Sequence, residues 1–156
     1  MAVETKSHLQ AETIDALQDL IQTNIDARDG FRFAAERIEN VAISSAFEMF
    51  AHERQMQADE LSAFVETNGE EARREGSYAA AVHRGWMNIR ELLSTGDDHA
   101  ILSEAERGED QIKSAYETTL RKTAGSAVND VLTRHYAQVK AAHDRVKLLR
   151  DEVLAE

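Results

Sequence analysis

The stretch ILSEAERGEDQIKSAY, residues 101–116, decides how the whole chain is interpreted. Its residues favour a helix, and four carboxylates stand within seven positions of it: Glu104, Glu106, Glu109 and Asp110. In a helical bundle, such acids either turn inward and hold a metal ion or form a solvated acidic face. Because side chains advance by about 100° per residue around a helix, the two alternatives place the acids on different faces.

The composition favours a single all-helical domain. The 156 residues are 42% hydrophobic and 30% charged, which is typical of a soluble globular protein with a core. Proline, which interrupts helix interiors, is absent, whereas the helix-favouring residues Ala, Glu, Leu, Arg and Gln are frequent. We therefore expect residues 1–156 to form one domain of long helices.

Hydrophobic periodicity predicts five helices and no strand. The expected helices span residues 7–39, 42–67, 78–93, 98–122 and 126–154. Two long helices, a crossover of about 30 residues that contains the shorter fifth helix, and two more long helices are the arrangement of a ferritin-like four-helix bundle. Its halves are two antiparallel hairpins, because the turn within each pair is short. The alternative is a five-helix array in which the short helix packs as an equal member.

Local signals mark helix boundaries. Ser7 and Gln10 predict a capping box at the start of the first helix. Asp97 or Asp98 predicts the N-cap of the helix over residues 98–122. The charged and glycine-containing stretch TNGEEARREGS, residues 67–77, predicts a linker between the hairpins.

Charge and hydropathy exclude two classes of partner. The formal net charge is −11 and no stripe of Lys and Arg is present, which argues against binding to nucleic acid. An acidic chain is also repelled by an anionic membrane surface, and no apolar run approaches the roughly 18 residues of a membrane span. The first residues contain no apolar signal segment, so we expect a cytoplasmic location.

Most forms of catalysis lack their residues here. There is no cysteine, which excludes disulfides, thiolate zinc sites and thiol catalysis. Serines and threonines occur at caps and turns rather than beside a base, and no glycine-rich phosphate loop follows a strand. The sequence therefore does not indicate an enzyme.

Four segments carry a family likeness. They are LIQTNIDARDGFRFAAE (20–36), HRGWMNIRELLSTGDDHAIL (83–102), ERGEDQIKSAYE (106–117) and VKAAHDRVKLLRD (139–151). Together they resemble a bacterial family of ferritin-like four-helix-bundle domains of unknown function. The resemblance implies a ferritin-like fold and says little about activity, because fold does not fix function. Many members of the wider ferritin-like group hold a di-iron centre, which is therefore the alternative to test.

A di-iron or di-manganese site of this class needs a Glu from each of two helices and a Glu-x-x-His pair from each of the other two. No Glu-x-x-His occurs in the chain. Of the acids in residues 101–116, Glu109 faces inward, Glu104 and Glu106 border the apolar face, and Asp110 faces outward. In the last helix His135 faces inward and His143 borders the apolar face. The candidate ligands for Fe, Mn or Zn are thus Glu106, Glu109, His135 and His143.

The inward polar residues form a different pattern. Asn24, Arg28, Arg54, Gln57 and Glu109 lie near helix midpoints, and His135 lies about three turns into its helix. Because the midpoints of antiparallel helices share a level, we expect one polar layer across the core. Glu109 should pair with Arg54 or Arg28, and the remaining members should complete the hydrogen bonds. Such a layer either fixes the register of the bundle or lets its arginines bind a small anion.

The sequence thus predicts a stress-related, structural or interaction protein, with a mid-bundle polar layer in place of a complete di-iron site and no cofactor. The alternative is a metal-binding oxidoreductase or iron-handling protein of the di-iron or di-manganese type. A third class is a scaffold that dimerises through a bundle face. Ile25, Phe33 and Met49 fall off the main apolar stripes and predict a second buried face, against the short helix or against another copy in a homodimer.

Overall fold

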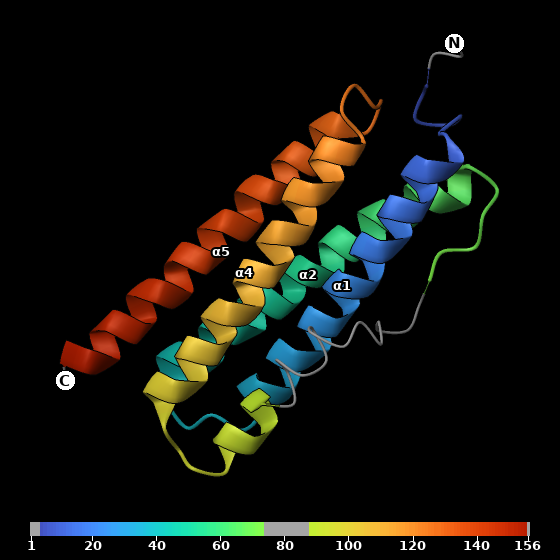
Figure 1. The fold of residues 1–156 in the computed structure, drawn as a ribbon. Helices are drawn as coiled ribbons and strands as arrows, with labels where there is room; N and C mark the ends of the chain where they lie inside the picture. Colours follow the sequence, from blue (N-terminus) through green and yellow to red (C-terminus); the bar gives the residue numbers. More distant parts are fainter. Residues whose placement is uncertain (1–3, 74–87, 156) are drawn as a thin grey trace.

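The computed structural model describes residues 4–73 and 88–155, and this part of the chain contains four long helices and no strand. Helix α1 spans Ala11–Ala35, α2 spans Val41–Thr67, α4 spans Asp98–Lys122 and α5 spans Asn129–Ala155 (Figure 1). Residues 88–93 are also helical. The all-helical prediction is therefore confirmed. The rest of the helix expected over residues 78–93 lies outside the described residues.

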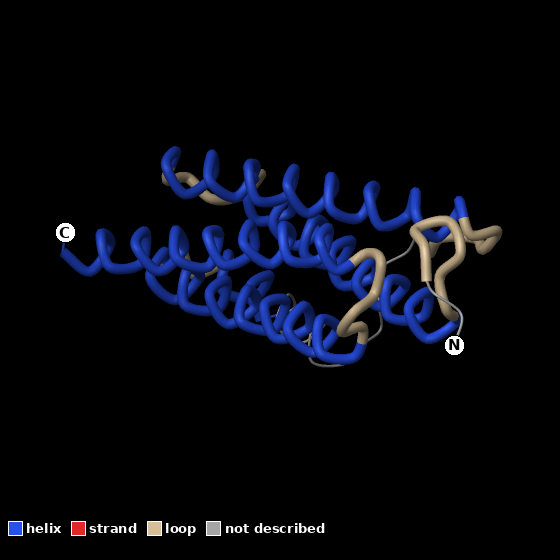
Figure 2. The backbone as a smooth tube through the Cα atoms, turned by 90° about the horizontal axis from the view of Figure 1, so that it is seen from above, coloured by secondary structure: helices blue, strands red, loops and turns tan. Residues whose placement is uncertain are grey.

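The long helices pack lengthwise as two antiparallel hairpins, α1 with α2 and α4 with α5 (Figures 1 and 2). The turns within the hairpins, residues 36–40 and 123–128, are short. Helix α2 ends at one end of the molecule, and α4 begins at the opposite end (Figure 1). Helix α4 therefore runs antiparallel to α1, and α5 runs antiparallel to α2. In this arrangement, residues on neighbouring helices can be compared by their distance from the same end of the bundle.

The start of α1 differs from the prediction. The capping box of Ser7 and Gln10 is wrong, because α1 begins at Ala11 and the Gln10 side chain makes no capping hydrogen bond. The carboxylate of Glu4 caps this end of α1 instead. It accepts hydrogen bonds from the Gln10 backbone N–H (3.0 Å) and the Thr13 hydroxyl (2.8 Å). Glu4 also accepts from Ser126 and from the Ala127 backbone N–H, so one side chain joins both hairpins.

The other helix ends follow local chemistry. Asn40 and Asp97 are N-caps, and their side chains accept from the backbone N–H groups of Ile43 and Ala100, each at 3.1 Å. Helix α1 ends at Ala35, four residues earlier than expected. Helix α5 begins at Asn129, because the turn before it includes Gly125 at φ 81°, a conformation that glycine adopts without strain.

The core is apolar at both ends and polar at its middle. Near the α1–α2 turn, the Phe31 ring packs against Phe47 and Phe50, with centroids 5.1 and 5.4 Å apart. Two residues expected to mark a second face are covered by the chain itself: Ile25 is buried, and the half-buried Phe33 ring lies under the guanidinium of Arg37. Only Met49 of that set is exposed. Within the described residues, no helix is both long and apolar enough to cross a membrane.

Candidate functional site

Three helices place a polar residue at the same level. Asn24 stands thirteen residues after the first residue of α1, and Arg54 and Glu109 stand thirteen residues before the last residues of α2 and α4. All three are fully buried, and Gln57 and His135 are only 2% and 1% exposed. These five of the six residues expected in the polar layer therefore lie inside the bundle. They divide into two clusters.

The first cluster centres on Arg54. Its Nη1 donates to Gln57 Oε1 at 2.7 Å, and Gln57 Nε2 donates to Gln138 Oε1 at 3.0 Å. Arg54 Nη2 lies 3.7 Å from Glu109 Oε2, which is an ion pair but too long for a hydrogen bond. Arg54 Nε and Nη2 and both Glu109 oxygens have no hydrogen-bond partner. The pair is thus held by charge attraction in a place that water does not reach.

The two charges of this pair respond differently to burial. Burial raises the pKa of Glu109, the positive charge of Arg54 lowers it, and the nearby Glu53 carboxylate raises it again. Burial also raises the pKa of Glu53 itself. A guanidinium keeps its proton at any ordinary pH. Glu109 is therefore the member of the pair that can become neutral.

The second cluster is a chain of hydrogen bonds from α1 to the surface. Asn24 Nδ2 donates to the Tyr116 hydroxyl at 2.9 Å, and that hydroxyl lies 3.1 Å from His135 Nδ1. His135 Nε2 lies 2.6 Å from Glu60 Oε1. Since Asn24 donates to the Tyr116 oxygen, the phenol can donate to His135 Nδ1, which leaves the His135 proton on Nε2 facing Glu60. Each donor from Asn24 through Tyr116 to His135 then points toward the surface, and the His135 ring is neutral.

Charge at the outer end of the chain supports this assignment. Arg134 donates to both oxygens of Glu60, at 2.9 and 2.8 Å, and these bonds lower the pKa of Glu60 to about 2, with a further contribution from His135. Burial lowers the pKa of His135, which favours the neutral ring, although Glu60 acts in the opposite direction. Glu60 therefore accepts bonds as a carboxylate while His135 stays uncharged near neutral pH.

Sequence reasoning missed two members of this chain. Tyr116 is fully buried, and it stands seven residues after Glu109, on nearly the same face of α4. That spacing was a usable signal. Glu60 lies at the edge of α2 and its side chain is 35% exposed, but its length lets it reach back to His135. The positions of apolar residues around a helix do not show how far such a side chain can extend.

The remaining candidates lie apart from the layer. Arg28 is at the α1–α2 surface, where it donates to Gln55 Oε1 (2.6 Å) and Asp29 Oδ1 (2.8 Å), so its expected place in the layer was wrong. Its side chain is 19% exposed. Glu109 consequently has Arg54 as its cation.

The four candidate metal ligands divide into separate places. His143 and Glu106 lie together on the α4–α5 side, where His143 Nε2 is 2.8 Å from Asp110 and 3.7 Å from Glu106. Glu106 is also paired with Arg150. Glu109 faces Arg54, and His135 faces Glu60 and Tyr116. Across residues 4–73 and 88–155, no three His, Asp or Glu side chains are arranged to hold a metal ion.

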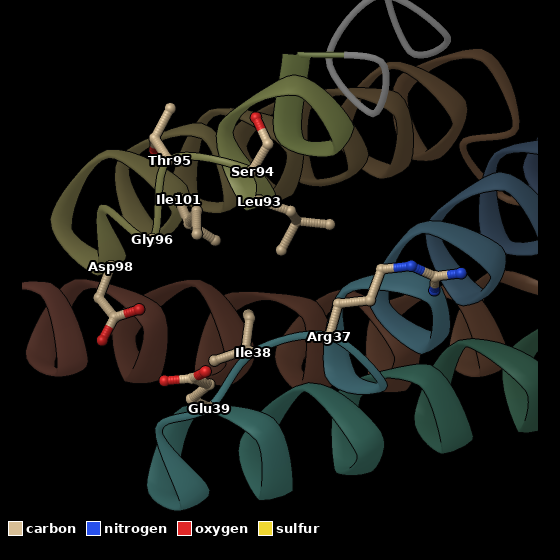
Figure 3. A pocket seen from close by; sticks show the side chains of 9 residues that line it. All are labelled: Arg37, Ile38, Glu39, Leu93, Ser94, Thr95, Gly96, Asp98 and Ile101. Atoms are coloured by element: carbon tan, nitrogen blue, oxygen red, sulfur yellow. The ribbon is translucent and has the colours of Figure 1, made fainter.

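Among the hollows on the described surface, two differ in their relation to the polar layer. A groove of about 250 Å³ opens between α2 and α5 directly over the layer; it is lined by Glu53, Met56, Gln57, Glu60, Arg134, His135 and Gln138. A second hollow, of about 320 Å³, lies at the α1–α2 turn beside residues 93–98 (Figure 3). Figure 3 shows Ile38, Leu93 and Ile101 between its walls, with the acidic groups of Glu39 and Asp98 and the side chain of Arg37 around them. Only the first hollow adjoins the polar layer.

Comparison with known sequences identifies the family. No curated protein matches the chain. The family model described as a domain of unknown function, DUF2383, matches residues 12–122, which run from α1 to the end of α4. The matched region includes Asn24, Arg54, Glu109 and Tyr116, and α5 with His135 lies beyond it. Because the match covers more than half of the chain, this protein belongs to the DUF2383 family.

Proposed function

We propose that this protein is a ferritin-like bundle that acts as a structural or interaction protein, with a polar layer in place of a di-iron site. The ferritin-like assignment is supported by the two antiparallel hairpins and by the positions of α2 and α4, which end and begin at opposite ends of the bundle (Figure 1). A stress-related role and a cytoplasmic location stay predictions from the sequence.

The observation that carries the proposal is the fully buried guanidinium of Arg54 at the level where related bundles hold metal. Two divalent cations in a core need several inward carboxylates for charge neutrality. At this level α1 supplies an amide, Asn24, and α4 supplies a single carboxylate, Glu109. A permanent positive charge 3.7 Å from that carboxylate repels a metal cation and supplies the neutralising charge itself.

The layer has a structural purpose in such a protein. A buried ion pair contributes little net stability, because the loss of hydration offsets the attraction. It does penalise arrangements in which one charge loses its partner. Sliding α2 or α4 by one turn would separate Arg54 from Glu109, so the layer favours one register of the two hairpins. A uniquely registered bundle presents a defined outer surface to a partner.

The second candidate function is metal binding, as an oxidoreductase or iron-handling protein. One observation favours it: both oxygens of the fully buried Glu109 lack hydrogen-bond partners. Glu53 is a second carboxylate near Glu109, and its burial raises its pKa. In this alternative, a single ion held by the two acids would have to displace Arg54.

Elemental analysis separates the two functions. The protein is purified without chelator or affinity tag and incubated aerobically with ferrous iron, in parallel with a Glu109→Gln variant that keeps the shape of the side chain. The proposal predicts the same small substoichiometric metal content in both proteins. Near-stoichiometric iron, manganese or zinc in the natural chain that disappears in the variant would overturn it.

A further inference from the structure

Tyr116 is fully buried, yet its hydroxyl contacts a side chain that reaches the surface. The hydroxyl lies 3.1 Å from His135 Nδ1, and His135 lines the groove between α2 and α5. The two rings meet edge to face, with centroids 5.8 Å apart and an interplanar angle of 74°. One side chain thus connects a phenol in the core to a surface hollow.

Tyrosine is one of the few side-chain types that lose a single electron readily. The chain has three tyrosines, one tryptophan and no cysteine. Tyr116 and Tyr136 are among the described residues, whereas Tyr78 and Trp86 lie outside them. A phenol that loses an electron becomes a strong acid, so the electron leaves easily only when a base takes the hydroxyl proton in the same step. The hydrogen-bond acceptor of each tyrosine therefore determines how readily it is oxidised.

The two described tyrosines have acceptors of different strength. Because Asn24 donates to the Tyr116 oxygen, the hydroxyl proton of Tyr116 points to His135 Nδ1. The Tyr136 hydroxyl donates instead to Glu117 Oε1, at 3.2 Å. Imidazoles are stronger bases than carboxylates by about two pKa units. Burial lowers the pKa of His135, which keeps its ring neutral and its Nδ1 free to accept the proton of Tyr116.

A proton received at Nδ1 turns His135 into a cation, and Glu60 stabilises that charge. Glu60 Oε1 lies 2.6 Å from His135 Nε2. Hydrogen bonds from Arg134 lower the pKa of Glu60 to about 2, so its carboxylate is ionised before the proton arrives. Glu53, a second carboxylate of α2, lines the same groove. The new positive charge therefore forms beside an existing negative one.

Two arginines act against the cation. Arg134 of α5 and Arg54 of α2 both lower the pKa of His135. The side chain of Arg134 is 53% exposed and paired with Glu60, so solvent and that carboxylate screen its charge. The charge of Arg54 is offset by Glu109 of α4. His135 is therefore neutral at rest, and it gains a charge only together with the proton of an oxidised neighbour.

We propose that Tyr116 is a one-electron redox site that reduces oxygen-centred radicals arriving at the groove between α2 and α5. One electron passes from Tyr116 to the radical, which becomes an anion. The O–H bond of Tyr116 breaks, and its proton forms an N–H bond at His135 Nδ1. The products are a neutral tyrosyl radical and a His135 cation beside the Glu60 carboxylate. This activity is separate from the proposed structural or interaction role.

Burial suits a tyrosine with this activity. Tyr116 has no exposed surface, so its radical cannot couple with a second tyrosyl radical. Burial also raises the pKa of Tyr116, which keeps the hydroxyl protonated until the electron leaves. On the α1 side, the uncharged Asn24 donates to the hydroxyl oxygen at 2.9 Å, and this bond stays in place when the proton leaves. The neutral radical is therefore held in its original position.

The first test oxidises the natural chain with photogenerated tris(bipyridine)ruthenium(III) and records radicals by electron paramagnetic resonance. We expect a long-lived neutral tyrosyl radical in the natural chain and in the control variant Tyr136→Phe. Tyr116→Phe, shown to be folded by circular dichroism, should lose that radical. The proposal is overturned if the natural chain forms no long-lived tyrosyl radical, or if Tyr116→Phe forms it in the same yield.

The rate of radical formation in the natural chain tests His135 as the proton acceptor without any substitution. The rate should be lower in heavy water than in ordinary water, because the O–H bond breaks in the same step. Within the pH range where circular dichroism shows the native fold, the rate should also fall as His135 becomes protonated, since the cation cannot accept the Tyr116 proton. A purely structural His135 predicts neither effect. A rate indifferent to both solvent and pH would refute the proton transfer.

Two variants assign the roles of His135 and Glu60. His135→Asn keeps an oxygen near the place of Nδ1 but cannot take up the proton, so the rate should fall about 10²–10⁴-fold. Glu60 is a positioning residue, and Glu60→Gln should move the acid decline of the rate to lower pH, because Glu60 raises the pKa of His135. Met56→Leu, in the same groove, is the matched control and should change neither property. An unchanged rate in His135→Asn would overturn the proposal, whereas metal loading in the separate elemental analysis would refute the proposed function instead.

Discussion

Replacing Glu109 with leucine removes the carboxylate that forms an ion pair with Arg54. Leucine approximates the volume of the lost side chain and adds no polar atom. It leaves the Arg54 guanidinium fully buried, with a single hydrogen bond from Nη1 to Gln57 and two nitrogens without partners. Because the guanidinium cannot lose its proton, this charge stays in the core of the variant.

The size of the effect follows from that uncompensated charge. Removing one partner of a buried ion pair costs about 3–5 kcal/mol. The 3.7 Å separation and the missing hydrogen bonds place this pair at the lower end, about 3 kcal/mol. For a domain of this length, each kcal/mol lowers the melting temperature by about 2–4 °C, so a decrease of about 6–12 °C is expected.

Two further variants turn the experiment into a thermodynamic cycle. Arg54→Met should destabilise the protein less than Glu109→Leu, because the Glu109 that it leaves behind can take up a proton. The double variant should be as stable as the natural chain or up to about 4 kcal/mol more stable, since it removes both buried charges together. A double variant that is more stable than the sum of the two single effects would show that Arg54 and Glu109 interact as a pair.

Urea unfolding followed by circular dichroism supplies the free energies for this cycle. Glu109→Leu should be the most destabilised of the three variants. If Glu109→Leu unfolds within about 1 kcal/mol of the natural chain, the guanidinium has found water or another partner, and the paired polar layer does not exist as described.

Three other perturbations follow from single contacts. Tyr116→Phe removes the bridge between Asn24 and His135 and should cost about 1–3 kcal/mol in unfolding free energy, measured by the same urea titration. The pKa of Glu60 is lowered from 4.5 to about 2, so its contribution is complete above pH 4.5 and is lost as the pH falls toward 2. Glu60→Gln should flatten stability across that range in an acid titration and, with its exposure discounted, cost about 1 kcal/mol at neutral pH; an unchanged acid titration curve would contradict the assigned bonds. Gly69 has φ 80° with open space around it, so Gly69→Ala should cost about 1–2 kcal/mol in thermal unfolding through backbone strain alone.

Facial periodicity predicted which residues turn inward, because it depends only on angle around the helix. Asn24, Arg54 and Glu109 stand in the middle of apolar arcs, and the structure buries all three. Helix ends with a cap beside them in the sequence, such as Asp97 before α4, were predictable for the same local reason.

Contacts that depend on reach or on distant segments were not predictable in this way. Arg28 and Glu60 both lie at the edges of their helices, where a long side chain can turn either outward or inward. Arg28 found partners at the surface, whereas Glu60 reached back to the buried His135. The cap of α1 by Glu4 depends on the α4–α5 turn, 122 residues away, and no local pattern reports it.

The pH dependence of these groups cannot be read from residue types alone. Burial lowers the pKa of His135, so stability is lost as the pH falls below its ordinary value of 6.5 and the unfolded chain takes up the proton. Burial raises the pKa of Glu109, so its buried carboxylate opposes stability as the pH rises above 4.5. Two inward residues thus have opposite slopes, set by their neighbours.

The most direct test of the central claim is thermal unfolding in the presence of a chelator and in the presence of saturating Mn²⁺, Zn²⁺ or, without oxygen, Fe²⁺. An ion bound by the folded state at 100 times its dissociation constant adds about 2.7 kcal/mol to stability. If Arg54 supplies the charge that neutralises Glu109, the melting temperature is the same under all conditions. A rise with one metal that is absent in Glu109→Gln would contradict the account and make the layer a metal site.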